Sequence, residues 1–240
     1  MNNLNIILLH GWLLNSNIWV DFKELFPKNI KIITPDLPGY GRNKEICSED
    51  KDFCLDYFSK ITKPSVLISW SYGGLLSLKY VFNKYPYIKK LVLLNSNLSI
   101  YKDNTHLNHK NIIKLKGDLI KDRNKTIKEF LFECCKNSEF SEKEYKIIVK
   151  QFPKHNFPSN EILVNNLNYM IDSNHIDCIK NSYKDILIIN GSNDQFTKNE
   201  PKTYISNNNV RYELIKGMGH IPFISFKEKV FKIIMDFLNY

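Results

Sequence analysis

The chain has 240 residues and a mass of 28.3 kDa, which allows one large α/β domain or two small ones. Hydrophobic residues make up 43% and charged residues 25%, a balance that is typical of globular proteins and excludes wholesale disorder. The formal net charge is +9, but only three of the 34 basic residues are arginine, the residue best suited to reading bases and phosphates. Together with 29 asparagines, this lysine excess is as readily explained by compositional bias as by selection for an anionic partner.

The cellular compartment is suggested by what the chain lacks. No basic segment precedes a long apolar stretch, so we expect no signal peptide. The apolar runs are about four residues long, far from the roughly 20 residues that a membrane span needs. The five cysteines show neither CxxC spacing nor paired histidine ligands, which favours reduced thiols in a cytoplasmic protein and predicts no metal site.

Short apolar runs rich in β-branched residues predict the framework of the fold. They lie at 5–9, 31–34, 65–68, 90–94, 185–189 and 210–215, and several are apolar throughout, as in strands that are covered on both faces. Helical periodicity follows at 74–85 and closes the chain at 225–238. This alternation predicts an α/β fold, with a mostly parallel sheet of about six strands and helices on both faces.

Between residues 101 and 180 the alternation stops. Helical patterns occupy about 110–135, 142–151 and 160–171, the last two preceded by the helix-capping residues Ser141 and Ser159. We therefore expect residues 1–100 and 181–240 to form the α/β core, with 101–180 as a helical insertion.

The segment with the clearest chemical meaning surrounds Ser71. A buried strand runs into Ser69-Trp70-Ser71-Tyr72-Gly73-Gly74, and a helix follows. This is the strand–turn–helix setting of the nucleophile elbow, usually G-x-S-x-G, whose tight turn needs small residues on either side of the nucleophile. An ordinary serine at a helix N-cap would give a similar local pattern.

A base and an acid for this serine lie at two other strand ends. His220 follows the last predicted strand in a Gly-Met-Gly-His loop, and Asp194 follows the strand at 185–189. An aspartate can hold the histidine in the tautomer that accepts the serine proton. Alone, Asp194 could be an Asx-turn residue and His220 a solvated loop residue. Together, the order Ser71, Asp194, His220 is that of an α/β-hydrolase triad.

An acyl-transfer site also needs donors for the oxyanion, and backbone amides are suited because they are fixed before the charge develops. We expect one from Tyr72, which follows the serine, and one from Trp12, which follows Gly11 after the first strand. The Trp12 side chain itself could equally be a core aromatic. Asp36, in the tight loop after the second strand, is assigned a structural role.

These segments together resemble the α/β-hydrolase superfamily over nearly the whole chain. The motifs are LLHGW, DLPGYGR, SWSYGG, GSND and GHIPFIS, and within the superfamily they are most similar to the pimeloyl-[acyl-carrier protein] methyl ester carboxylesterases of biotin synthesis. Two features depart from the family: Ser69 stands where a glycine is usual, and the first strand begins too early to leave room for the superfamily's first two strands.

The resemblance implies a serine carboxylesterase that needs no cofactor and acts on an ester carried by acyl carrier protein. The insertion would be a lid, and we expect the protein to be a monomer. The implied substrate-binding residues are Trp12, Ser71, Tyr72 and His220, with Phe130, Leu131, Phe132, Glu133 and Cys134 of the lid along the acyl channel. Simple packing of a lid helix would account for the lid residues equally well.

The family also uses basic lid residues against the acidic carrier protein. Residues 101–155 hold 13 Lys/Arg and 8 Asp/Glu, so part of the positive charge is concentrated there. The docking candidates are Lys121, Arg123, Lys125, Lys128 and Lys146. A solvated lysine-rich face is the competing interpretation.

Two other functions remain as alternatives. Another hydrolase of the same fold, a short-chain carboxylesterase or a carbon–carbon bond hydrolase, would share most of these motifs. A non-catalytic nucleic-acid-binding protein would use the net charge, but the sequence lacks arginine clusters, basic–aromatic strand motifs and a helix-turn-helix signature. We therefore expect neither nucleic acid nor membrane as a partner.

Overall fold

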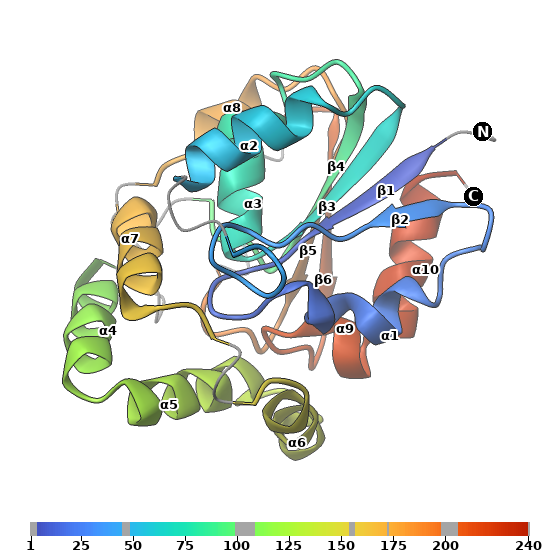
Figure 1. The fold of residues 1–240 in the computed structure, drawn as a ribbon. Helices are drawn as coiled ribbons and strands as arrows, with labels where there is room; N and C mark the ends of the chain where they lie inside the picture. The colour runs from blue at the N-terminus through green and yellow to red at the C-terminus, as the bar shows by residue number, and fades with distance from the viewer. Residues whose placement is uncertain are drawn as a thin grey trace.

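All six predicted strands form, and they make one parallel sheet (Figure 1). A computed structural model describes residues 4–44, 49–98, 109–153, 157–171, 173–197 and 206–239. The sheet order is β2-β1-β3-β4-β5-β6, and every neighbouring pair runs parallel. The strands are β1 (Asn5–Leu9), β2 (Lys31–Ile33), β3 (Ser65–Trp70), β4 (Ile88–Leu94), β5 (Ile186–Gly191) and β6 (Val210–Ile215). Their carboxyl ends therefore share one edge, where ligands of open α/β sheets bind.

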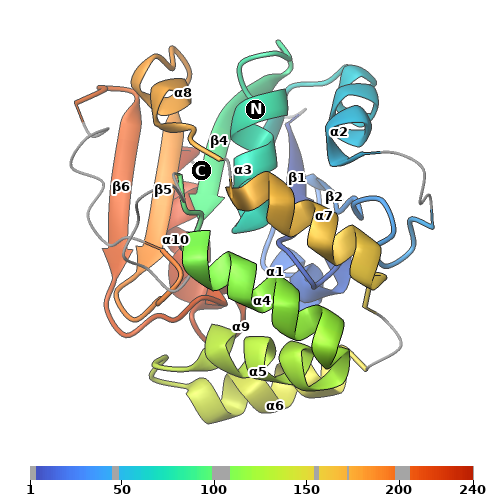
Figure 2. The same ribbon diagram turned by 90° about the vertical axis from the view of Figure 1, so that its left-hand side faces the viewer.

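Helices cover both faces of this sheet (Figures 1 and 2). One face carries α2 (Asp50–Ser59), α3 (Tyr72–Leu76) with the π-helical turn η2 (Ser77–Val81), and α8 (Ile176–Lys180). The other carries η1 (Ser16–Trp19), α1 (Val20–Lys23), α9 (Pro222–Ser225) and α10 (Lys227–Phe237). Because both faces are covered, β3 and β5 are buried along their whole length, which explains why their sequences are mostly apolar.

Four further helices are inserted between β4 and β5. They are α4 (His109–Lys121), α5 (Arg123–Cys135), α6 (Ser141–Gln151) and α7 (Asn160–Ile171), and we call them the insertion helices. Figure 2 shows the strand arrowheads directed toward α5 and α6, so the insertion helices lie beyond the carboxyl edge of the sheet. None of the described helices is long and apolar enough to cross a membrane.

The helices differ from the sequence expectations mainly where one residue breaks a periodic pattern. The stretch 110–135 is two helices, because the Asp122 carboxylate accepts the Lys125 backbone N–H and starts a new one. The closing helix is interrupted at Phe226, between α9 and α10. The short helices α1 and α8, as well as α2, had no apolar stripe strong enough to be predicted. Of these, α8 lies within the range expected to be insertion but packs against η2.

Candidate active site

Ser71 occupies the sharp turn between β3 and α3. Its backbone has φ 52° and ψ −118°, a left-handed conformation that non-glycine residues rarely adopt and that tends to be kept where function needs it. The chain after Ser71 runs so close to neighbouring segments that it leaves no room for side chains. A Cβ on Gly73 would lie 2.4 Å from the His10 carbonyl oxygen, and one on Gly74 would lie 2.1 Å from Ser96 Oγ. The two glycines after Ser71 are therefore demanded by packing against neighbouring strand ends.

Ser69, which stands at the first glycine position of the expected G-x-S-x-G pattern, fits the elbow because its hydroxyl is paired. Ser69 is fully buried, and its Oγ lies 2.6 Å from Ser77 Oγ, which in turn donates to the Gly73 carbonyl at 2.7 Å. A buried hydroxyl costs stability only when it lacks a partner. The departure from G-x-S-x-G is thus compensated by a second serine one turn into the following helix.

The structure brings Ser71, His220 and Asp194 into one hydrogen-bonded chain. His220 Nε2 lies 3.0 Å from Ser71 Oγ, and His220 Nδ1 lies 2.9 Å from Asp194 Oδ2. Asp194 accepts two more hydrogen bonds, from the Phe196 backbone N–H at 2.8 Å and from the Thr197 hydroxyl at 2.7 Å. Both His220 and Asp194 are at least 95% buried, so the carboxylate is held in one orientation by three donors.

The loop that carries His220 is held by residues from two strand ends. Trp70 Nε1 donates to the His220 carbonyl at 2.8 Å. Asn95, directly after β4, donates to the Gly219 carbonyl and accepts the Gly191 backbone N–H, both at 2.8 Å. Our sequence analysis did not identify Asn95; its only signal is a polar residue at the end of an apolar strand. Asn95 links the loops after β4, β5 and β6 and so positions His220 relative to Asp194.

The expected oxyanion residues lie beside Ser71. The loop after β1 approaches so closely that a Cβ on Gly11 would be 3.1 Å from Ser71 Cβ, and Trp12 follows directly. Tyr72 is the first residue of α3, where a backbone N–H has no acceptor within the helix. The Trp12 indole donates to the Leu163 carbonyl of α7 at 3.0 Å, so this side chain also ties the core to the insertion helices.

The second pair of acid and histidine, Asp36 and His10, is structural. Asp36 accepts backbone N–H groups of Ser16 and Arg42 at 2.7 and 2.9 Å, which fixes the loop after β2. His10 Nε2 accepts the Leu37 backbone N–H, and burial lowers the pKa of His10, so its imidazole is neutral. Among the described residues no group of three or more His, Cys, Asp or Glu side chains is arranged to hold a metal ion.

The space at Ser71 is very small. A cavity of about 10 Å³ is lined by Ser71, Tyr72, Asn97, Met170, Phe196 and His220, among others. That volume holds about one water molecule and no acyl chain. A larger cavity of about 440 Å³ lies between α4 and α5, and three of the predicted channel residues line it: Phe130, Phe132 and Glu133.

The other two predicted channel residues face elsewhere. Leu131 and Cys134 are 3% and 1% exposed and lie on a different face of α5 from the cavity lining, where they pack in the core. Burial raises the pKa of the Cys134 thiol well above its usual value, and burial likewise raises that of Cys135. Neither thiol is therefore activated as a nucleophile.

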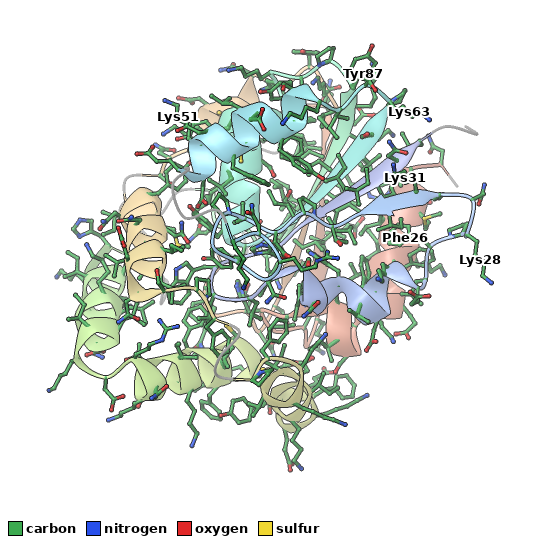
Figure 3. The ribbon with its side chains drawn as sticks, viewed as in Figure 1. Phe26, Lys28, Lys31, Lys51, Lys63 and Tyr87 are labelled. Carbon is green, nitrogen blue, oxygen red and sulfur yellow. The ribbon has the colours of Figure 1, made fainter. Side chains whose placement is uncertain are left out.

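The predicted docking residues divide into two groups. Lys121, Lys125, Lys128 and Lys146 are exposed on the insertion helices, two of them in ion pairs with a glutamate on the same helix. The Arg123 guanidinium instead donates to the Pro158 carbonyl at 2.6 Å and to the Asn160 side chain. Arg123 thus fastens α5 to the start of α7. Lysines are not confined to this side: Figure 3 shows Lys28, Lys31 and Lys63 around the opposite edge of the sheet.

A partly buried carboxyl connects the elbow to the insertion helices. Asp50 Oδ2 accepts the Tyr72 hydroxyl and the Asn166 side-chain N–H of α7, both at 2.6 Å. Asn166 also accepts the Tyr40 hydroxyl. This network borders a cavity of about 400 Å³, and burial raises the pKa of Asp50 to about 6. Our sequence analysis missed Asp50, because an acid at the start of a helix usually needs no further explanation.

The free energy of unfolding of the Asp50→Asn variant should depend on pH differently from that of the wild type. A folded-state pKa raised from 3.8 to about 6 means that the folded protein binds more protons between those values, so Asp50 lowers the free energy of unfolding as pH rises through this window. By pH 7.5 the ionisation of Asp50 lowers the free energy of unfolding by at most about 3 kcal/mol relative to pH values below 3.8. Urea unfolding at pH 4 and pH 7.5 should show Asp50→Asn gaining stability relative to wild type at the higher pH.

The control for this measurement is Asp52→Asn, which changes an exposed aspartate on the same helix. The difference in its free energy of unfolding from that of wild type should be the same at both pH values. If Asp50→Asn also follows wild type, the carboxyl at residue 50 is not the source of the pH dependence.

Comparisons with known proteins identify the family and confirm the fold. Residues 6–232 match the alpha/beta hydrolase family, so the chain belongs to that family. Solved structures with the same fold include an esterase from Exiguobacterium antarcticum (TM-score 0.81, 18% identity, covering 100% of this chain and 93% of the other). They also include an enol-lactonase from Burkholderia xenovorans (TM-score 0.83, 15% identity, 100% and 93%). The predicted α/β-hydrolase fold with a helical insertion is confirmed.

Two curated relatives carry the same description, pimeloyl-[acyl-carrier protein] methyl ester esterase. The protein of Pseudoalteromonas atlantica is 30% identical over 134 residues, about half of each chain (53% of this one and 51% of the relative). That of Yersinia pseudotuberculosis is 20% identical over 238 residues, which cover 97% of this chain and 92% of the relative. The chain is therefore an esterase-like member of the alpha/beta hydrolase family.

Proposed function

We propose that this protein is a serine carboxylesterase that hydrolyses the methyl ester of a pimeloyl group carried by acyl carrier protein. The observation that supports hydrolysis is the hydrogen-bonded chain from Ser71 through His220 to Asp194. The support for the substrate is the description of the curated relatives. Such a reaction belongs to the cytoplasm and needs no metal or organic cofactor.

In the proposed mechanism Ser71 Oγ attacks the ester carbonyl while His220 Nε2 takes its proton. Asp194 keeps the proton of His220 on Nδ1 and stabilises the imidazolium. The Trp12 and Tyr72 backbone amides hold the oxyanion. His220 then protonates the departing methanol, and a water activated by His220 cleaves the acyl-enzyme to release the free carboxylate.

The direct test is release of methanol and free carboxylate from methyl-pimeloyl acyl carrier protein by the purified enzyme. The thioester to the carrier must survive, so the products should be analysed for intact acyl carrier protein as well as for methanol. Intact carrier carrying a free terminal carboxylate supports the proposal, and absence of methanol rejects the proposed substrate.

A second candidate is a short-chain carboxylesterase or another hydrolase of this fold, including a carbon–carbon bond hydrolase. The cavity of about 10 Å³ beside Ser71 favours a small acyl group unless neighbouring side chains move. Comparison of kcat/KM for p-nitrophenyl acetate and for the carrier-linked ester separates the two. A large preference for the small ester would support the second candidate.

Carrier-protein docking is proposed for Lys121, Lys125 and Lys128. Two of these lysines, with Phe132 and Tyr145, line an open groove between α5 and α6. Reversing the charge of all three to glutamate should lower kcat/KM for the carrier-linked ester by about tenfold or more at low salt, because charge complementarity governs encounter with an acidic partner. Turnover of p-nitrophenyl acetate should stay unchanged.

The matched control reverses Lys28, Lys31 and Lys63, which changes the net charge equally at the opposite edge (Figure 3). This control should hydrolyse the carrier-linked ester as well as wild type does. Equal losses in both triple variants would mean that only net charge matters and would remove the docking site from the proposal.

A further inference from the structure

Two cavities of very different size meet at a single side chain, Phe196. Among the residues that the structure describes, the cavity of about 10 Å³ at Ser71 and the cavity of about 440 Å³ between α4 and α5 share only Phe196 as a lining residue. The smaller one contains the reacting groups but has no room for an acyl chain. The larger one falls in the range of small-molecule sites, 300 to about 1,000 Å³. Phe196 is therefore the wall between them.

Aromatic contacts hold the ring in this position. Its centroid lies 4.8 Å from that of His220, edge to face, and 5.5 Å from that of Phe130, nearly parallel. Phe130 in turn lies edge to face on Trp12, at 4.7 Å between centroids. Each such pair contributes only about 0.5–1.5 kcal/mol beyond burial, so displacement of the ring is energetically accessible.

The backbone of Phe196, in contrast, is fixed. Its N–H donates to Asp194 Oδ1 at 2.8 Å, and its carbonyl accepts the Asn97 side-chain N–H at 3.3 Å. The side chain can therefore turn about its own bonds without disturbing Asp194. A rotation that takes the ring off His220 would join the two cavities and leave the catalytic hydrogen bonds in place.

We propose that Phe196 is a specificity-determining residue that sets the length of the acyl group accepted at Ser71. With the ring over His220, the space beside the serine holds no acyl chain, which disfavours long acyl groups most; with the ring displaced, a longer chain extends from Ser71 into the cavity between α4 and α5. The chemical class is a medium-chain acyl ester. The inference rests on the proposed esterase activity, which it deepens.

The test compares kcat/KM for p-nitrophenyl acetate and p-nitrophenyl octanoate in wild type, Phe196→Ala, Phe196→Leu and Phe196→Trp. The octanoate-to-acetate ratio should rise about tenfold or more in Phe196→Ala, rise less in Phe196→Leu and fall in Phe196→Trp. The larger cavity has a mixed lining, so the gain depends on methylenes that reach its apolar side chains, Ile112, Leu115, Phe130 and Phe132; one such methylene is enough to change kcat/KM by about tenfold. Phe140→Ala removes a half-exposed ring that packs on Phe226 and lines neither cavity, and it should leave the ratio unchanged.

Equal losses on both substrates in the Phe196 variants would overturn the proposal, because a ring that only packs against His220 affects every ester alike. The same variants in a Ser71→Ala background, tested for binding of methyl octanoate by equilibrium dialysis, separate this result from failure of the esterase assignment. Tighter binding of methyl octanoate with Phe196→Ala supports the role of Phe196 as the wall between the two cavities, even if wild type hydrolyses no ester. Unchanged binding in that background counts against it.

Discussion

Replacing Ser71 with alanine should lower kcat for ester hydrolysis by about 10⁴-fold or more. The Ser71 hydroxyl is the only atom in the hydrogen-bonded chain that can form the acyl-enzyme, and His220 Nε2 is positioned 3.0 Å away to remove its proton. Without it His220 and Asp194 have no nucleophile to activate, and only the slower direct attack of water remains. Steady-state hydrolysis of p-nitrophenyl acetate and of the carrier-linked ester would measure the loss.

A matched substitution two residues earlier distinguishes loss of the nucleophile from disturbance of the elbow. Ser69→Ala removes a buried hydroxyl on the same turn, one that bonds only to Ser77. It should keep kcat within about tenfold of wild type and lower the free energy of unfolding by about 1 kcal/mol. If Ser71→Ala retains activity like that of Ser69→Ala, Ser71 is not the nucleophile and the proposed mechanism fails.

Replacing Asp194 with asparagine should lower kcat by about 10³- to 10⁴-fold while leaving the fold intact. The Phe196 N–H is bonded to one carboxylate oxygen of Asp194, and His220 Nδ1 and the Thr197 hydroxyl are bonded to the other. In the variant the amide oxygen suits the Phe196 N–H, which leaves the NH₂ group facing His220 Nδ1. His220 must then carry its proton on Nε2, where it can no longer accept the proton of Ser71.

The activity of Asp194→Asn should be compared with that of Asp36→Asn, which changes the other buried aspartate near a histidine. Asp36 accepts the backbone N–H groups of Ser16 at the start of η1 and of Arg42 in the loop after β2, and it lies outside the Ser71 chain. This variant should therefore lose stability but keep kcat/KM within about tenfold. Circular dichroism would check that both variants fold. Comparable activity losses in both would assign Asp194 a structural role like that of Asp36.

Much of the fold followed from local sequence because the parallel sheet is covered on both faces. β1 is a short apolar run that is buried over most of its length, and it was predicted at its observed bounds. β6 was also predicted at its observed bounds, although this edge strand is only partly buried and its sequence alternates apolar and polar residues. The helices were predicted less well. The break at Asp122 depends on a side-chain cap, which a periodic pattern averages out. The periodic pattern also did not distinguish the π-helical turn η2 from an α-helix.

The candidate site was predictable from the sequence: a serine in a tight strand–helix turn, with an acid and a histidine after later strands. Parallel strands end at one edge, so chain order alone implies that residues after β3, β5 and β6 lie together. The tertiary structure decided which contacts orient them: Ser77 beneath Ser69, Asn95 between three loops, Asp50 under Tyr72 and Phe196 between two cavities. These partners are far apart in the sequence or carry no motif, because hydrogen bonds and cavity walls are set by distance in space.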